Sequence, residues 1–269
     1  MGNSGDGPPP VLLWAVPRSV STAFEKTFAQ RADFTVIHEP FTDCYYFGPD
    51  RRSRRYGDQP SRSGYTARAA CQAVSESAGK RVFAKDLCFQ AEPYVDEAFL
   101  EKVTSTFILR APQVVLASLA PLKPDFTEDE FGYTAMERLW KRVTSVSPVP
   151  PVVVEGDRFR ESPRATLEAY CQRIGVPFSA DMLYWEHGAI RRWEPHERDS
   201  QAKWHSTLES SHGILPVTGG PKPARKPELP AHLSAALATA ERIYEMIVNS
   251  PGALPGASLN RVNTAQAGP

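Results

Sequence analysis

The chain has 269 residues, of which 41% are hydrophobic, so it can bury a substantial core in one domain or in two. Lysine and arginine together number 31, as do aspartate and glutamate, and this zero net charge argues against a surface that coats nucleic acid or a membrane. The start, MGNSGDGPPP, lacks the basic and apolar regions of a signal peptide, and no apolar run approaches the roughly 20 residues that cross a bilayer. We therefore expect a cytoplasmic protein.

Residues 11–24, VLLWAVPRSVSTAF, predict a buried strand, a tight turn and the start of a helix. The apolar run 11–16 suits a central parallel strand covered on both faces, and Pro17 ends it. The unpaired N–H groups and the dipole at a helix start, beside a fixed cation, bind phosphate or sulfate. An ordinary strand–helix corner with a polar cap is the alternative. The expected anion contacts are Arg18, Ser19, Val20, Ser21, Thr22 and Ala23.

This turn differs from the usual nucleotide loop. A Walker A motif needs GxxxxGK[ST], but no glycine lies between Val11 and Thr42. Arg18 offers a bidentate fork where the Walker lysine offers a point charge. The segment PRSVSTAF resembles the 5′-phosphosulfate loop of the sulfotransferases, and the resemblance implies 3′-phosphoadenosine 5′-phosphosulfate as the sulfuryl donor.

A second motif, STFILRAPQVVLASLAP, contains a strand that ends at Arg110 and a helix that carries Ser118. In sulfotransferases, an arginine at a strand end and a serine eight residues later bind the 3′-phosphate of the donor. The resemblance implies that role for Arg110 and Ser118. Ala111 departs from the family, which more often has aspartate there, so we expect a loop-bracing contact to be missing.

Short strands alternate with helices along the chain, which implies a mainly parallel sheet. The resemblance implies a three-layer α/β sandwich of the P-loop NTPase-like type. Ligands of such sheets lie outside the carboxyl ends of the strands, so Arg18, Glu39, Lys85 and Arg110 are expected to line one crevice. The strands after the first are expected at Phe34–Ile37, Arg81–Ala84, Thr106–Leu109 and Val152–Glu155.

The sulfotransferase domain is expected over residues 10–250, between disordered tails at 1–9 and 251–269. Residues 162–193 are expected to be helical, with Ser162 as the cap and Gly175 as a stop, and 231–249 form an amphipathic helix. The basic run 51–55 is either a mobile solvated loop or a site for an acidic acceptor.

Glu39, in VIHEPF, is the first candidate for the base that takes a proton from the acceptor. Bacterial and plant sulfotransferases similar in this segment place glutamate at the catalytic position. His38 is the second candidate, and because side chains alternate in an extended segment, only one of the two should face the crevice. The alternative is that Glu39 braces the loop before Pro40.

Lys85, in VFAKDLCFQ, is the candidate that neutralises charge on the bridging oxygen as the nucleotide leaves. Cytosolic sulfotransferases have KTH at a similar strand end, with the histidine as the base. Here Asp86 and Leu87 follow the lysine, which favours Glu39 as the base. Asp86 is expected to orient Lys85 or to pair with it, and a solvated Lys85 is the alternative.

The remaining motifs predict little chemistry. The six histidines lack paired ligand spacing, so no metal is expected. Arg225 and Lys226 lie where the family has an Arg-Lys-Gly contact to the 3′-phosphate, but Pro227 replaces the glycine. Packing or pocket-wall positions are expected for Trp185, Trp193 and Trp204. Reduced, mostly buried thiols are expected at Cys44, Cys71, Cys88 and Cys171.

The expected function is sulfuryl transfer to a hydroxyl or amine of a small metabolite. Two alternatives stay open. Sulfation can activate a hydroxyl for elimination or ring closure, or the chain can be a non-catalytic relative that serves as a partner subunit. The expected partners are the acceptor and, in an assembly, a second copy of the chain or a related subunit; no nucleic-acid or membrane partner is expected.

Overall fold

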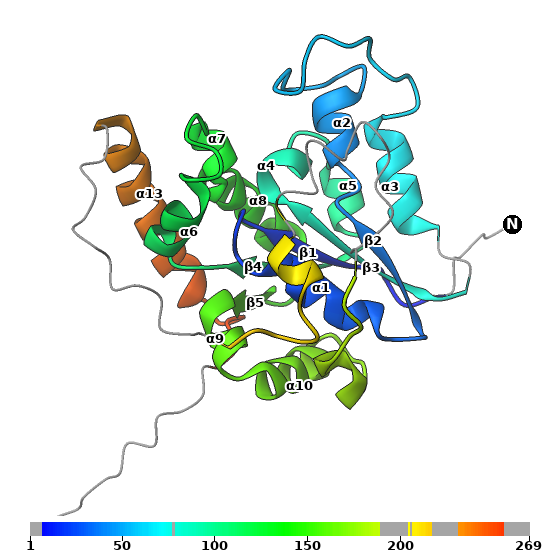
Figure 1. Ribbon diagram of the computed structural model, residues 1–269. Helices are drawn as coiled ribbons and strands as arrows, with labels where there is room; N and C mark the ends of the chain where they lie inside the picture. The colour runs from blue at the N-terminus through cyan, green and yellow to red at the C-terminus, as the bar shows by residue number, and fades with distance from the viewer. Residues whose placement is uncertain (1–6, 77–78, 189–203, 205, 217–230, 256–269) are drawn as a thin grey trace, which may run out of the picture.

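The computed structural model of the chain describes residues 7–76, 79–188, 204, 206–216 and 231–255. Five parallel strands form one sheet in the order β2-β3-β1-β4-β5 (Figure 1). The parallel sheet predicted from the alternation of strands and helices is thereby confirmed. The strands are β1 (Val11–Ala15), β2 (Phe34–His38), β3 (Arg81–Leu87), β4 (Thr104–Leu109) and β5 (Val152–Glu155).

The central strand β1 explains the apolar run at the start of the chain. It pairs with β3 on one side and β4 on the other, and its five side chains are at most 1% exposed. Leu12 and Trp14 pack into the core on one face of the sheet, whereas Val11 and Leu13 pack into the core on the other. A strand buried on both faces has no polar side, which is why hydrophobic and polar residues do not alternate along it.

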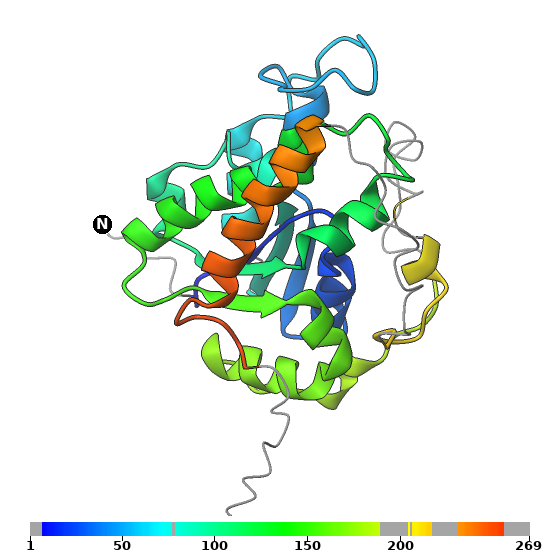
Figure 2. The same cartoon turned by 90° about the vertical axis from the view of Figure 1, so that its left-hand side faces the viewer.

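Helices cover both faces of the sheet and complete the three layers. α1 and α10 pack on the face of Val11 and Leu13, and α8 and α13 lie side by side on the opposite face (Figure 2). Among the described residues, no helix is long and apolar enough to cross a membrane. The described helices are α1 (Ser21–Ala29), α2 (Thr42–Phe47), α3 (Ala67–Ser75), α4 (Cys88–Ala91), α5 (Glu97–Leu100), α6 (Pro112–Leu119), α7 (Glu128–Phe131), α8 (Tyr133–Val146), α9 (Gly156–Glu161), α10 (Pro163–Arg173), η1 (Ala180–Leu183), α12 (Ser206–Glu209) and α13 (Ala231–Val248).

The strand order places a natural binding crevice at the carboxyl end of β1. From β1 the chain runs outward to β2, returns as β3 beside β1, and then crosses to the other side of β1 as β4. The connection that leaves β1 therefore runs towards β2, whereas the connection that leaves β3 runs in the opposite direction, to β4. Open parallel sheets bind ligands where the strand order reverses in this way.

Two strands run further than the sequence predicts. β2 continues to His38 and β3 to Leu87, so Lys85 lies within a strand and not beyond its end. The reason is the pairing of β3 on both sides: Lys85 is in register with His38 of β2 and with Leu13 of β1. Because β3 forms backbone hydrogen bonds with a strand on each side, the chain stays extended through Lys85, and the side chain of Lys85 is buried.

The predicted helical region 162–193 is confirmed at its start, where α10 covers Pro163–Arg173 and Gly175 follows as the expected stop, and it is wrong beyond that point. α10 ends at Arg173, Gly175 then has a φ of +72°, and only the short η1 follows before residues 184–188, which are not helical. Ser162 occupies the cap position, but its side chain makes no capping bond. The rest of that region, including Trp193, lies outside the described residues.

The ordered chain continues past residue 250, where we placed the end of the domain. The N–H of Val153 donates to Gly252 O at 2.9 Å, and the N–H of Leu254 donates to Val153 O at 2.9 Å. This segment adds a parallel bridge to the free edge of β5 and buries Leu254. Residues 1–6 and 256–269 of the expected tails lie outside the described residues.

The four cysteines are free thiols, as predicted, and three of them are buried. Burial, ahead of the nearby Asp86 and Asp43 carboxylates, raises the pKa of Cys44 to about 12. Burial also raises the pKa of Cys171 to about 11. These thiols therefore remain protonated at neutral pH and belong to the core.

The turn between β1 and α1 packs directly on two glycines from other elements. A Cβ on Gly156, the first residue of α9, would lie 2.6 Å from the backbone O of Ser19. A Cβ on Gly132 would lie 2.7 Å from Pro17 Cδ, and the φ of Gly132 is +89°. Side chains at these two positions would displace the turn.

We predict that Gly156→Ala lowers the free energy of unfolding by about 1–3 kcal/mol, the usual cost of inserting a methyl group into packed space. The conflict is with backbone, which cannot rotate away, and it outweighs the better helix propensity of alanine. Denaturant unfolding measures the change. Gly64→Ala is the control, because no atom lies within 4 Å of a Cβ there. Equal stability of the two variants would contradict the packing described.

Candidate functional site

The turn that follows β1 has an unusual backbone without glycine. Arg18 and Val20 both have left-handed conformations, with φ of 59° and 71°. This conformation is rare for residues with a side chain, and rarest for β-branched ones such as valine, and such strain accumulates at functional sites. The buried Ser19 hydroxyl donates to Val16 O at 2.7 Å and ties the turn to the end of β1. This corrects our prediction for Ser19, whose side chain faces the protein interior and not the crevice.

The start of α1 presents backbone N–H groups to a cavity. Ser21, Thr22 and Ala23 line it, and Val20 at the cap position has no side-chain oxygen to occupy them. The first N–H groups of any helix lack partners within the helix. The positive end of α1 therefore points into the cavity, as the sequence predicted.

The cavity, of about 320 Å³, lies at the carboxyl edge of the sheet. Its wall contains Arg18, Glu39, Lys85 and Arg110, the four residues that we expected to meet in one crevice, and also Ser118. The prediction that these four residues line one crevice is thus confirmed. The volume of the cavity suits a small-molecule site.

One end of the cavity is cationic. The Arg18 Nε donates to Ser118 Oγ at 2.9 Å, and Arg18 Nη1 donates to the backbone O of Trp204 at 3.1 Å. Burial, and then the charge of Arg110, lower the pKa of the Arg18 guanidinium. Arg160 of α9 lines the same wall. Three guanidiniums in one cavity repel one another, so a bound anion would relieve that repulsion.

Asp157 of α9 holds Arg110. The Arg110 Nε and Nη2 donate to Asp157 Oδ1 at 2.9 and 2.6 Å, and the Tyr133 hydroxyl donates to Arg110 O. The brace that we expected to be lost with Ala111 is therefore supplied from another strand end. Asp157 and Arg160 escaped the sequence analysis, although their position just beyond β5 is the signal that would have found them.

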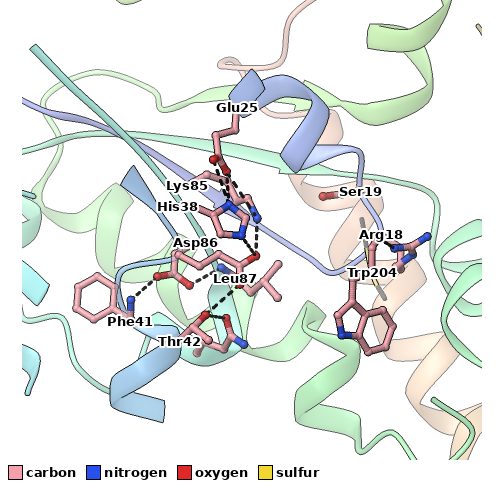
Figure 3. A network of polar contacts seen from close by, with 12 residues as sticks. Arg18, Ser19, Glu25, His38, Phe41, Thr42, Lys85, Asp86, Leu87 and Trp204 are labelled. Carbon is pink, nitrogen blue, oxygen red and sulfur yellow. Dashed lines mark hydrogen bonds and ion pairs between the residues drawn. The ribbon is translucent and has the colours of Figure 1, made fainter. Parts of the chain in front are cut away.

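The other end of the cavity holds a buried ion pair. The Lys85 Nζ donates to Glu39 Oε1 at 2.5 Å, and Thr42 Oγ1 donates to Glu39 Oε2 at 3.0 Å (Figure 3). Lys85 is 1% exposed, so the alternative of a solvated lysine is wrong. Burial alone would lower the pKa of Lys85, but the Glu39 and Glu25 carboxylates outweigh it and raise that pKa. Lys85 is therefore charged.

Of His38 and Glu39, Glu39 is the residue that reaches the cavity. Glu39 lines the cavity, whereas the His38 Nδ1 donates to Glu25 Oε2 at 2.8 Å on the inner side of α1. That only one of the two faces the crevice agrees with the prediction, although the cause is different. Glu39 has a φ of 45°, so the chain turns directly after β2 instead of staying extended.

Asp86 does not do what the sequence predicted. Its Oδ2 accepts from the N–H of Phe41 and its Oδ1 from the N–H of Leu87, both at 2.7 Å. The carboxylates within 4.0 Å of Lys85 Nζ are instead those of Glu39 and Glu25. Asp86 thus braces the backbone that carries Glu39.

Two further predictions meet the structure nearby. In the basic run 51–55, Arg55 donates to both oxygens of Glu130 at 2.7 Å and to Asp125, so this residue is fixed and not mobile. Trp204 lines the cavity, and Trp185 is buried with its Nε1 donating to Ser211 Oγ.

Arg225 and Lys226 lie outside the described residues. Within the described ranges, no three His, Cys, Asp or Glu side chains are grouped as ligands for a metal ion.

Two curated proteins of Arabidopsis thaliana are similar to this chain. Branched-chain-amino-acid aminotransferase-like protein 2 is 26% identical over 212 residues, which is 76% of this chain and 36% of that protein. Branched-chain-amino-acid aminotransferase-like protein 1 is 24% identical over 218 residues, 77% of this chain and 37% of that protein. The chain thus spans little more than a third of the length of either relative.

Two solved structures share the fold. The sulfotransferase domain of the Synechococcus PCC 7002 olefin synthase has a TM-score of 0.56 and 15% identity, covering 91% of this chain and 98% of that one. The sulfotransferase domain from the curacin biosynthetic pathway has a TM-score of 0.55 and 12% identity, covering 90% and 98%. The sequence model of the sulfotransferase domain matches residues 10–240, and on this match the chain belongs to the sulfotransferase domain family.

Proposed function

We propose that this protein transfers a sulfuryl group from 3′-phosphoadenosine 5′-phosphosulfate to a hydroxyl or amine of a small molecule. One observation carries the proposal: a single cavity joins a cationic end, formed by Arg18, Arg110 and the start of α1, to a buried Glu39–Lys85 pair. The cationic end suits a nucleotide with two separate anionic groups, and the Glu39–Lys85 pair supplies a proton acceptor and a fixed cation. Membership of the sulfotransferase domain family supports the same reaction.

The donor has a natural orientation in this cavity. Its phosphosulfate would lie on Arg18 and the N–H groups of Ser21 to Ala23, and its 3′-phosphate on Arg110 and Ser118. The Arg18–Ser118 hydrogen bond joins the two groups of contacts, so both ends of the nucleotide would meet a connected set of donors. Bidentate guanidinium contacts favour such tetrahedral anions.

The chemistry follows from what faces the sulfur atom. The acceptor O–H bond breaks as its proton passes to Glu39, the acceptor oxygen forms a bond to sulfur, and the bond from sulfur to the phosphate oxygen breaks with its electrons moving to the nucleotide. Lys85 is placed to neutralise the charge that develops on that oxygen. Glu39 is held by Lys85 and Thr42, so it needs no reorganisation before the reaction.

We predict that the protein with the sulfuryl donor converts at least one member of a panel of small alcohols, phenols and amines. Release of 3′-phosphoadenosine 5′-phosphate and a mass gain of one SO₃ on the acceptor measure the transfer. A nucleotide product with an acceptor that has lost water would show that sulfation serves elimination or ring closure. Absence of nucleotide release with every acceptor would contradict the proposal and favour a non-catalytic subunit.

Arg18→Ala and Arg110→Ala are each expected to weaken binding of 3′-phosphoadenosine 5′-phosphate about 10- to 150-fold, because each removes a charge-assisted contact worth about 1.5–3 kcal/mol. The Arg110 change should matter much less for adenosine 5′-phosphate, which lacks the 3′-phosphate. Calorimetry measures both ligands, with Arg164→Ala on the exposed side of α10 as the control. Equal losses for the two ligands in Arg110→Ala would contradict the 3′-phosphate assignment.

Glu39→Gln is expected to lower kcat about 10²- to 10⁴-fold, the usual contribution of a general base, while nucleotide affinity stays within a few-fold. The amide has nearly the same shape, and its oxygen can still accept from Lys85 Nζ, so this hydrogen bond is kept while proton acceptance is lost. His38→Ala should cost less, because its ring does not line the cavity. Loss of activity in His38→Ala with full activity in Glu39→Gln would reverse these roles.

A further inference from the structure

Glu25 is a buried carboxylate for which the proposed reaction has no direct use. It lies on α1, one turn after the N–H groups that face the cavity, and it is 3% exposed. Its neighbours on the inner side of α1, Phe24 and Phe28, are fully buried hydrophobic residues. A carboxylate in such a place is costly unless charged or hydrogen-bonding groups compensate it.

His38 supplies the first compensation. Its Nδ1 lies 2.8 Å from Glu25 Oε2 and 3.1 Å from Glu25 Oε1, and its side chain is 5% exposed. A carboxylate only accepts hydrogen bonds, so the proton of this contact is on Nδ1. The hydrogen bond made by one ring nitrogen fixes the orientation and the proton position of a histidine. Glu25 therefore determines where the other nitrogen, Nε2, points.

That second nitrogen points to the candidate base. His38 Nε2 lies 3.8 Å from Glu39 Oε1, the same oxygen that accepts from Lys85 Nζ. Glu25 Oε2 also lies 4.0 Å from Lys85 Nζ, and Figure 3 shows Glu25, His38 and Lys85 together. With Glu39 they form one buried cluster of ionisable side chains. His38 and Lys85 are register partners on adjacent strands, which places them on the face of the sheet that α1 covers.

We propose that Glu25 is a positioning residue for sulfuryl transfer: by holding His38 at Nδ1, it keeps Nε2 directed at Glu39, so that His38 receives the proton that Glu39 takes from the acceptor. The inference rests on the proposed function, because it extends the path of the same proton. It also connects the reaction to the donor loop, since Glu25 and the anion-binding N–H groups are on one helix.

The proton is conserved along this path. Glu39 gains it as the acceptor O–H bond breaks, and the bond between that proton and Glu39 then breaks as a bond to His38 Nε2 forms. Nδ1 keeps its own proton and Glu25 stays ionised, so the ring becomes positive beside a carboxylate. Glu39 returns to its ionised form beside Lys85. After the product leaves, His38 Nε2 gives its extra proton back through Glu39 to water in the cavity, which resets both groups for the next acceptor.

The first test needs no acceptor. In ¹⁵N NMR spectra of the full chain, the His38 signals, identified by their loss in His38→Gln, should show the proton on Nδ1. Glu25→Met, which has similar length and cannot accept this bond, should abolish that preference. A wild-type ring with its proton on Nε2, or one unaffected by Glu25→Met, would overturn the proposal whatever the protein catalyses.

The second test separates positioning from packing. With the best acceptor of the panel, Glu25→Met should lower kcat about 10- to 100-fold, the effect seen when a metal-binding histidine loses the partner that orients it. Glu25→Gln should lower kcat less. Affinity for 3′-phosphoadenosine 5′-phosphate should stay within about threefold. Unchanged kcat in Glu25→Met, with the NMR change present, would make the Glu25–His38 contact purely structural and overturn the proposal while leaving the proposed function intact.

The pH profile gives a readout that packing would not move. The charged or titratable groups around Glu25 and Glu39 are His38, Lys85, Asp86 and Tyr56. Removing the negative charge of Glu25 makes it easier for its neighbours to lose a proton, so the acidic limb of kcat against pH should move to lower pH in both variants. If the acidic limb of kcat against pH stays at the same pH in both variants, the proposal is overturned.

Glu137→Gln is the matched control, because it removes one charge from α8 at a position outside the cavity wall. It should leave both kcat and the pH profile unchanged. A limb shift in this control as large as that in Glu25→Gln would assign the effect to overall charge and overturn the proposal.

Discussion

The buried ammonium group of Lys85 is the constraint around which this site is organised. The lysine lies within β3, paired with strands on both sides, and it is 1% exposed. A charge in such a place requires carboxylates close by, and removing one partner of a buried pair is far more costly than losing a surface pair. Glu39 and Glu25 meet that need from two different elements. The left-handed conformation of Glu39 turns the chain after β2, and Asp86 holds the backbone at Phe41 by a hydrogen bond. Both features keep the Glu39 carboxylate beside Lys85 of β3.

The cationic end of the cavity depends on a different constraint, the close approach of backbone segments. The turn after β1 has two left-handed residues and no glycine, and it is held from outside by Gly132 and Gly156. Phosphate loops usually place glycine in the loop itself. Here Arg18 and Val20 occupy the left-handed positions of the turn, and the glycines that allow close packing lie in the neighbouring segments. This arrangement gives the anion a guanidinium within the loop.

The sequence predicted the fold and the meeting of Arg18, Glu39, Lys85 and Arg110 because these features depend on local patterns and on one geometric rule. An apolar run followed by a charged residue marks each strand end, and a proline follows in three of the five strands. Parallel strands bring their carboxyl ends together. The segment PRSVSTAF, which resembles the phosphosulfate loop, lies within the residues 10–240 that match the family. In 162–193 the helix before Gly175 followed the local signals, whereas the part after Gly175 has no Ser-Pro helix start of that kind and the prediction failed there.

The partners of these residues could not be predicted, because they come from distant parts of the chain. Asp157 reaches Arg110 across 47 positions and Glu25 reaches Lys85 from a different layer. In the sequence, Ser19 cannot be distinguished from the nearby hydroxyl residues Ser21 and Thr22. The backbone conformation of the turn directs the Ser19 hydroxyl towards Val16 O in the protein interior. Composition and periodicity do not encode such contacts.

Calorimetric titration of the full chain with 3′-phosphoadenosine 5′-phosphate measures whether the cationic end of the cavity binds the nucleotide, independently of any acceptor. We expect one site per chain with a dissociation constant in the micromolar range or below, and weaker binding at higher salt because the phosphate contacts are screened. Absence of binding at millimolar nucleotide would contradict this expectation.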